Sequence, residues 1–209
     1  MKNIAAFTFF TPVRIEYGAG KVDTLLTEIK ALKASRPLVI TDKGVINAGL
    51  LSPIETQLRE GGMTYDIFSD IASNPTDTSV TEAAGLARAK KHDLVIAVGG
   101  GSSMDAAKAV ALLAVVGGSV HDYLGYDQMD RRGLPLITIP TTAGTGSEVT
   151  IWSVITDTRG DIPIKASIGS GLICPSVALV DPCMTLSMPQ QLTAYTGLDA
   201  LSHAVESYC

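Results

Sequence analysis

Cysteine, aromatic residues and long apolar runs are all scarce in this chain of 209 residues. The three cysteines form no C-x-x-C pair, so neither a disulfide framework nor a cysteine zinc motif is indicated. No apolar run approaches the roughly 18 residues that a membrane-spanning helix needs, and no small-residue cleavage site follows the first apolar stretch. We therefore expect a cytoplasmic protein that has no membrane partner.

Positive charge is also sparse. The chain has 16 lysines and arginines against 21 acidic residues, with a net charge of −5 and no basic run. Nucleic acid is therefore not expected as a partner, because phosphate backbones are bound by clustered positive charge. A hydrophobic content of 46% over this length suffices for one sizeable domain, or for one domain and part of another.

Glycine, in contrast, is concentrated at one position. Residues 94–98 have the length and branched side chains of a buried strand, three glycines follow at 99–101, and residues 106–114 suit a helix. The first N–H groups of a helix are unpaired and attract anions, and glycine lets a phosphate approach them. Ser102 and Ser103 add hydroxyl donors. We interpret the turn as a pyrophosphate cradle. The alternative is a tight strand-to-helix turn without a ligand, since the spacing is not G-x-G-x-x-G.

Predicted strands and helices alternate from residue 37 to residue 140. Buried strands are expected at 37–41, 65–68, 94–98 and 134–140, with helices between them. This order predicts an α/β fold with a Rossmann-like parallel sheet and helices on both of its faces. After it, residues 152–156 and 163–168 have the pattern of a hairpin, and residues 177–180 that of one more strand.

Polar residues follow several of these strands. Asp42, Asn74 and the pair Thr141-Thr142 come after predicted strands, as the glycine turn does. In parallel sheets ligands bind beyond the carboxyl ends of the strands. The four segments should therefore converge on one crevice, which supports a ligand more strongly than the glycine turn alone.

The character of the sequence changes after Met188-Pro189. Apolar residues then recur at helical spacing: Leu192, Tyr195, Leu198, Leu201 and Val205. We place a domain boundary near Leu186, with an α/β domain over residues 1–185 and the first helix of an all-helical domain over residues 186–209. The apolar side of that helix should be exposed on the chain alone and favour association.

Asp199 and His203 lie four residues apart in this last segment, so they project from one side of a helix. A carboxylate and an imidazole in that arrangement can hold a divalent metal. On spacing alone, a surface Asp–His pair without metal is the commoner case, and two ligands do not complete a coordination shell.

Three motifs together resemble the iron-containing, or group III, alcohol dehydrogenases. They read GGGSSMDAAK at 99–108, PTTAGTGSEVT at 140–150 and TGLDALSHAVE at 196–206. The resemblance implies an NAD(P)-dependent oxidoreductase that transfers hydride between a primary or secondary alcohol and the cofactor. It also implies an N-terminal dinucleotide domain and a C-terminal helical domain that holds the metal.

The resemblance also implies roles for single residues. Asp42 is matched to the acid that receives the adenosine ribose, and we expect NAD rather than NADP because a carboxylate would repel a 2′-phosphate. The other residues matched to cofactor contacts are Asn74, Gly100, Gly101, Ser102, Ser103, Thr141, Thr142, Thr150, Trp152, Lys165, Met184 and Met188.

Asp199 and His203 are matched to the first two metal ligands, with iron(II) expected and zinc as the alternative. Family members carry two further histidine ligands in helices beyond this point, whereas the sequence given stops at Cys209. We therefore expect this chain alone to bind metal weakly and to turn over alcohols poorly. We also expect a small alcohol, aldehyde or ketone as substrate and a homo-oligomer, a dimer or larger.

Two alternatives stay open. Glycerol dehydrogenases and dehydroquinate synthases share the two-domain plan, although residues 145–148 favour the iron-type alcohol dehydrogenases. The chain could also be a nucleotide-binding module without catalysis.

Overall fold

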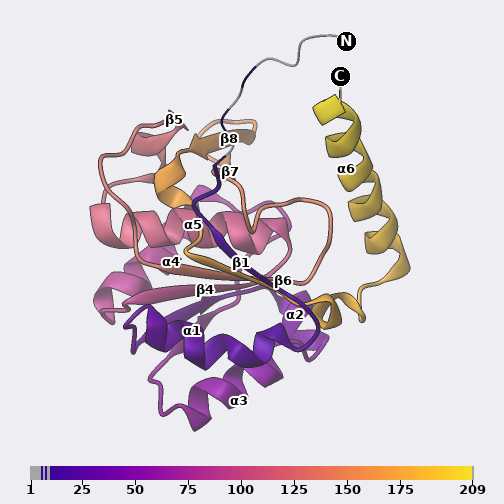
Figure 1. Cartoon of the computed structure of the whole chain (residues 1–209). Coiled ribbons are helices and arrows are strands. Elements are labelled where there is room, and N and C mark those ends of the chain that lie inside the picture. Colours follow the sequence, from indigo (N-terminus) through magenta and orange to yellow (C-terminus); the bar gives the residue numbers. More distant parts are fainter. Residues whose placement is uncertain (1–5, 7, 9, 209) are drawn as a thin grey trace.

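The computed structural model describes residue 6, residue 8 and residues 10–208, and a six-stranded parallel sheet lies at its centre (Figure 1). Along the sheet the order is β1-β9-β6-β4-β2-β3, and each neighbouring pair is parallel. The strands are β1 (Arg14–Tyr17), β2 (Pro37–Ile40), β3 (Asp66–Phe68), β4 (Leu94–Gly99), β6 (Leu136–Pro140) and β9 (Val177–Val180). The predicted parallel sheet is confirmed.

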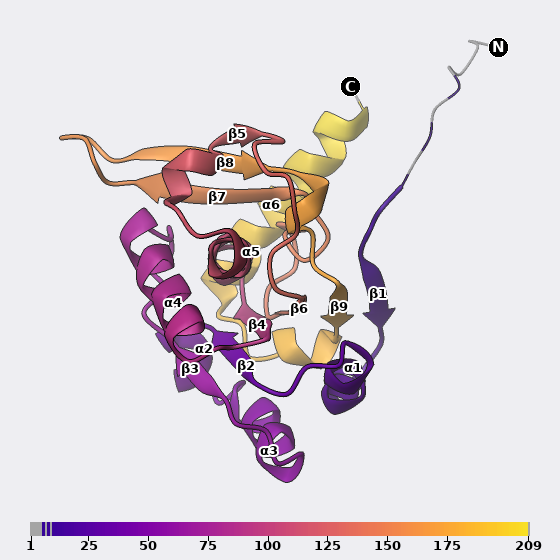
Figure 2. The ribbon, with the colours of Figure 1, turned by 90° about the vertical axis from the view of Figure 1, so that its left-hand side faces the viewer.

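Helices cover both faces of this sheet, as predicted (Figure 2). One face packs against α1 (Leu25–Ala31) and α3 (Ser52–Glu60), and the other packs against α4 (Asp77–Ala89) and α5 (Gly101–Val116). Strand β4 shows the alternation, because Val95 and Ala97 belong to one core and Leu94, Ile96 and Val98 to the other. Burial on both sides explains why the strands read as continuous apolar runs.

A smaller sheet lies on the far side of α5 (Figure 2). It contains β5 (Gly125–Tyr126), β8 (Ile164–Gly169) and β7 (Trp152–Asp157) in that order, and β7 and β8 form the predicted antiparallel hairpin. Ile155 and Ile168 pack into the same core as α5. Helix α5 is therefore enclosed by the two sheets, which accounts for the apolar residues around its whole circumference.

Short helices connect these elements. Asp42 caps α2 (Lys43–Asn47), a helix that the sequence analysis did not predict. Four 3₁₀ turns complete the order: η1 (Lys21–Thr24), η2 (Val120–Tyr123), η3 (Gly171–Ile173) and η4 (Pro182–Thr185).

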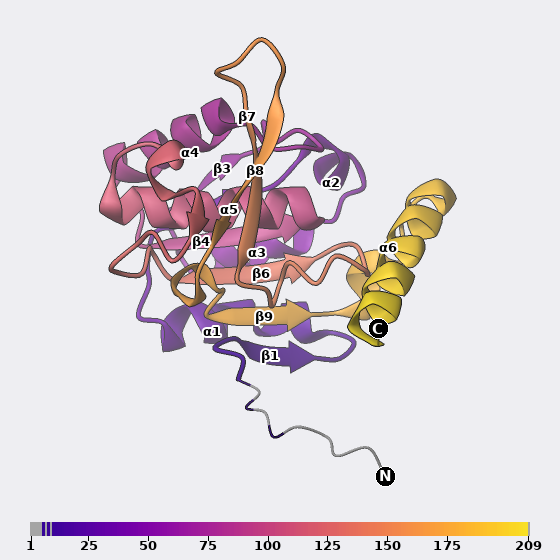
Figure 3. The ribbon, with the colours of Figure 1, turned by 90° about the horizontal axis from the view of Figure 1, so that it is seen from above.

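The last helix, α6 (Gln190–Tyr208), stands beside the sheet at the end towards which the arrows of β6 and β9 point (Figure 3). Thr196 is the residue of α6 that is buried. The predicted exposed apolar side is confirmed, because Leu198 is 62% exposed and Leu201 is 58% exposed. Within the described ranges, no helix combines the length and the apolar character that a membrane crossing requires.

Candidate functional site

A large cavity lies at the carboxyl ends of β2, β4 and β6, and it measures about 840 Å³. The sheet contributes its strand ends and the glycine turn, and α6 with its preceding segment contributes the opposite wall. From the sheet side the lining includes Asp42, Gly100, Gly101, Ser102, Ser103, Thr141 and Thr142; from the other side it includes Met188, Leu192 and Thr196. The structure thus brings together strand ends that the sequence predicts to converge.

The glycine turn leaves no room for larger residues. Gly99 has a φ of +156°, and a Cβ there would lie 2.5 Å from the Ser103 Oγ. A Cβ on Gly101 would lie 3.0 Å from the Thr145 Cγ2. Helix α5 begins at Gly101, and its first turn has no acidic residue. The first N–H groups of α5, at the wall of the cavity, can therefore meet an anion.

The two serine hydroxyls of this turn are already engaged with protein acceptors. Ser103 Oγ donates to Asp42 Oδ2 at 3.0 Å, and Ser102 Oγ donates to the Ser73 carbonyl. The sequence analysis expected both hydroxyls to donate to phosphate. In the structure these two hydroxyls fix the walls of the turn, which leaves the N–H groups of the first turn of α5 as the donors that an anion would meet.

Asp42 is held in place by two donors. Its Oδ1 accepts from the Val45 N–H at 3.0 Å, which caps α2, and its Oδ2 accepts from Ser103. A carboxylate at the end of β2 is thus fixed in the cavity wall and keeps acceptor capacity for a ligand hydroxyl.

Thr142 contributes a hydroxyl that lacks a partner. Its Oγ1 is buried and makes no hydrogen bond within the part of the chain that the structure describes. A buried polar atom without a partner costs about 1–3 kcal/mol. Because this hydroxyl lies beside the glycine turn, a bound ligand could supply the missing partner.

A second cavity of about 510 Å³ shares Ser73, Gly101, Ser102 and Thr145 with the first. The sheet side contributes Asn74, Thr150, Trp152 and Lys165, and α6 contributes Asp199 and His203. Trp152 is 43% exposed, and the centroid of its ring lies 5.9 Å from the centroid of the Tyr126 ring. The two cavities therefore form one crevice that is divided at the N-terminus of α5.

The Asp199 and His203 side chains face one another at the α6 end of this crevice. Asp199 Oδ1 and His203 Nε2 are 3.8 Å apart, and the side chains are 43% and 55% exposed. That spacing allows both atoms to bind one ion with bonds of about 2.1 Å. The pair fits part of a metal coordination shell.

Met184 is the predicted contact that lines neither cavity. Its side chain is 3% exposed and packs in the core beneath the sheet, with residues such as Val22 and Leu179. Met188, four residues later, does line the first cavity.

A buried polar cluster that the sequence did not reveal lies behind the second cavity. Lys108 on α5 is fully buried, and its Nζ donates to Ser147 Oγ at 3.0 Å, Thr150 Oγ1 at 3.1 Å and the Trp152 carbonyl at 2.6 Å. Burial lowers the pKa of Lys108, whereas the Asp105 carboxylate, 3.6 Å away, opposes that shift. A lysine followed by eight apolar residues, with an aspartate three residues before it on the same helix, was the signal that could have revealed this cluster.

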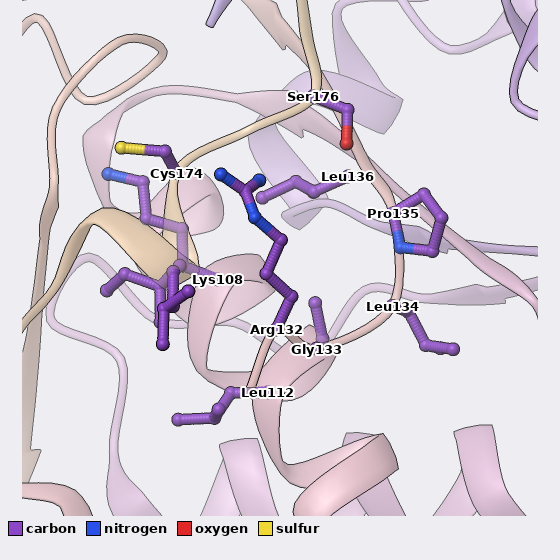
Figure 4. A pocket seen from close by; sticks show the side chains of 12 residues that line it. Lys108, Leu112, Arg132, Gly133, Leu134, Pro135, Leu136, Cys174 and Ser176 are labelled. Atoms are coloured by element: carbon purple, nitrogen blue, oxygen red, sulfur yellow. The ribbon is translucent and has the colours of Figure 1, made fainter. Parts of the chain in front are cut away.

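A small cavity of about 110 Å³ lies on another side of α5, near the start of β6 (Figure 4). Lys108, Arg132, Cys174 and Ser176 contribute polar side-chain atoms to its lining. Burial raises the pKa of the Cys174 thiol, although the charges of Lys108 and Arg132 oppose this. This small cavity is lined by Lys108, which also belongs to the polar cluster. It has no lining residue in common with the crevice.

A second group that sequence reasoning missed joins α4, η2 and β7. His121 Nε2 lies 2.9 Å from Asp77 Oδ2, and His121 Nδ1 lies 3.6 Å from Asp157 Oδ2. Burial would raise the pKa of Asp77, but hydrogen bonds from Thr158, Thr78 and His121 outweigh it, so the pKa is lowered. These bonds fix the C-terminal end of β7, where the turn of the β7–β8 hairpin begins.

Known proteins with similar sequences point to one family. A family model described as iron-containing alcohol dehydrogenase matches residues 12–182. The chain is 44% identical to long-chain-alcohol dehydrogenase 1 of Geobacillus thermodenitrificans, over 99% of this chain and 51% of that protein.

Solved structures agree. The crystal structure of a 1,3-propanediol oxidoreductase is similar with a TM-score of 0.90 at 33% identity, over 96% of this chain and 52% of the other. Sulfoacetaldehyde reductase from Bifidobacterium kashiwanohense in complex with NAD⁺ is similar with a TM-score of 0.87 at 36% identity, over 97% and 53%. The chain thus spans about half the length of the relatives it matches. On this evidence the chain belongs to the iron-containing alcohol dehydrogenase family.

Proposed function

We propose that the whole protein is an NAD-dependent, metal-assisted alcohol dehydrogenase, and that this chain supplies its dinucleotide site and two of its metal ligands. One observation carries the proposal: a single crevice has a fixed carboxylate at one end, a glycine-walled helix N-terminus in the middle and an Asp–His pair at the other end. This is the order of groups that an adenosine, a pyrophosphate and a reacting centre would require.

The first cavity suits the adenosine and pyrophosphate half of the cofactor. Asp42 would accept from the ribose hydroxyls, the N–H groups at the start of α5 would bind pyrophosphate, and Thr142 would gain its missing partner. A similar protein was solved in complex with NAD⁺, which supports the same ligand here. The Asp42 carboxylate supports NAD over NADP because it would repel a 2′-phosphate.

The second cavity suits the nicotinamide half. Asn74, Thr150, Trp152 and Lys165 would contact the ligand, with Gly101 and Ser102 at the junction. The adenosine and pyrophosphate half, in the first cavity, would also contact Gly100, Ser103, Thr141 and Met188. Met184 would act only by supporting the segment that leads to Met188, since it is buried in the core.

We assign Asp199 and His203 as two ligands of a divalent metal, with iron(II) favoured by the family to which the chain belongs. When bound, the nicotinamide would supply hydride chemistry and the metal would supply a Lewis acid for the oxygen of a small alcohol, aldehyde or ketone. Two ligands give a weak site, so tight binding would need groups from elsewhere in the whole protein.

The domain boundary near Leu186 is part of this proposal. Leu186 is 82% exposed and lies between η4 and α6. The exposed apolar side of α6 would then face other parts of the whole protein or a second subunit, in a homo-oligomer of cytoplasmic location.

NADH binding tests the proposal directly. Calorimetry on the chain should show NADH binding at micromolar to millimolar concentration, with quenching of Trp152, which is the single tryptophan. NADPH should bind about tenfold more weakly, and Asp42→Gly should reduce that difference. Asp161→Gly, at the exposed tip of the hairpin, is the matched control and should change neither affinity. A folded sample that binds no NADH at millimolar concentration would refute the proposal.

A further inference from the structure

Lys108 is buried at a position where a charge requires partners. Lys108 is the largest residue whose side chain is fully buried, and its nearest neighbours along α5, at 106, 107, 109 and 110, are apolar. The nearest opposite charge is the Asp105 carboxylate, 3.6 Å from the Nζ. An ammonium in such surroundings is costly unless its three protons all find acceptors. Ser147, Thr150 and Trp152 provide three acceptors, each within 3.1 Å of the Nζ.

The direction of each hydrogen bond in this cluster is determined. The Trp152 carbonyl can only accept. Ser147 Oγ donates its own proton to Asp105 Oδ1 at 2.6 Å, so it accepts from Lys108. The ammonium has no lone pair, so Thr150 Oγ1 must also accept from it.

The hydroxyl proton of Thr150 consequently points away from Lys108. No hydrogen bond donated by that hydroxyl is found among the described residues, and Thr150 borders the second cavity. Ser147 and Trp152 border the same cavity. One buried ammonium therefore anchors three residues of the wall segment 147–152 and leaves one hydroxyl proton available to a ligand.

We propose that Lys108 is a positioning residue for the nicotinamide half of the dinucleotide site, and that it acts by making Thr150 a hydrogen-bond donor to an acceptor oxygen of that half. The inference rests on the proposed function. Beyond the proposed function, the inference assigns a role to a residue that does not touch the ligand. It also states that Thr150 is the donor in its hydrogen bond to the ligand.

The two halves of the ligand allow a direct test. ADP-ribose contains the half assigned to the first cavity, whereas NADH contains both halves. Lys108→Met should weaken NADH binding roughly three- to tenfold, the range expected for one hydrogen bond, and change ADP-ribose binding less than twofold. Both affinities are measured by calorimetry on the whole 209-residue chain.

A double-mutant cycle tests the route through Thr150. Thr150→Val should show the same loss confined to NADH, while Thr150→Ser should keep the affinity. Because both changes act on the same hydrogen bond from Thr150 to the ligand, NADH affinity in Lys108→Met combined with Thr150→Val should be no weaker than in either variant alone. Additive losses would contradict the route through Thr150.

Controls separate the possible failures. Lys30→Met, at an exposed position on α1, should leave both affinities unchanged. If Lys108→Met does not fold by circular dichroism, Ser147→Ala removes one anchor and should still lower NADH affinity about twofold while sparing ADP-ribose. Equal losses for both ligands, or none, would overturn the inference while the proposed function stands. An unaltered protein that binds neither ligand would refute the proposed function, and the inference with it.

Discussion

The strand β4 with its following helix α5 and the helix α6 form two sides of one crevice, yet they are packed very differently. Every residue of β4 is buried, and α5 is enclosed by two sheets. In α6 the buried residue is Thr196, and Leu198 and Leu201 are more than half exposed. The side of the crevice that we propose for the dinucleotide is therefore built into the core, whereas the two proposed metal ligands lie on a helix that is mostly exposed.

This difference has a consequence for the site. Residues that belong to a core keep their geometry without help, while those on a weakly packed helix depend on further contacts. We therefore expect dinucleotide binding to persist under conditions that displace α6, and metal binding to be lost first.

The largest effect should come from the core of the sheet. Ile96 in β4 is fully buried, so Ile96→Ala leaves a cavity and should lower the free energy of unfolding by about 2–5 kcal/mol. Urea denaturation measures the change. A decrease in the free energy of unfolding below about 0.5 kcal/mol would show that β4 is no more tightly packed than α6.

A smaller effect should come from the contact between the two regions. A Cβ on Gly144 would lie 2.2 Å from the Thr196 carbonyl oxygen, and Gly144 has a φ of +145°. Gly144→Ala should displace α6 and cost roughly 1–3 kcal/mol. Chymotrypsin should then cut at Tyr195 roughly tenfold faster, because α6 would detach more often. An unchanged cutting rate would mean that this contact does not hold the helix.

Acid should act on the α/β region through Asp77. The folded pKa of Asp77 is below the unfolded value, so its contribution is present above about pH 4 and is lost as the pH falls through the folded pKa. Asp77→Asn should cost about 1–2 kcal/mol at pH 7 and flatten the decline in stability below pH 4. Thermal melts between pH 2 and pH 7 measure both. If the stability of the unaltered protein and that of Asp77→Asn fell equally below pH 4, Asp77 would not be the source of the acid sensitivity.

The smallest effect should come from α6 itself. Leu201 is 58% exposed, so Leu201→Ala should change the free energy of unfolding by less than about 0.5 kcal/mol. It should instead reduce self-association in sedimentation velocity, since it shortens an exposed apolar side. A large loss of stability would show that α6 packs more tightly than its exposure indicates.

The sequence predicted those parts of the fold that depend on local pattern. Apolar runs such as residues 94–98 gave the strands of the sheet, because burial on both faces leaves a continuous signal. The hairpin of residues 152–156 and 163–168 followed from the strand pattern on either side of a turn. Helix α2 was missed because it is five residues long and has almost no periodicity.

The site was predicted less completely, because its partners come from distant segments. The strand-end rule placed Asp42 and Thr142 at one edge. It could not show that Ser103 donates to Asp42, or that His121 lies between Asp77 and Asp157, since these pairs depend on tertiary packing. Lys108 is buried because the β7–β8 hairpin covers α5, and no local sequence pattern predicts where that hairpin packs.

The position of β9 within the sheet sets the timing of folding during synthesis. β9 lies between β1 and β6, and Arg14 pairs with Val177. At roughly 5–20 residues per second, a ribosome needs about 10–30 s to travel from one partner to the other. During that interval β1 has no neighbour, and once β6 has been made, one of its edges stays open to other chains until β9 follows. A chaperone that shields this edge should therefore raise the yield of folded protein more than one that acts after release.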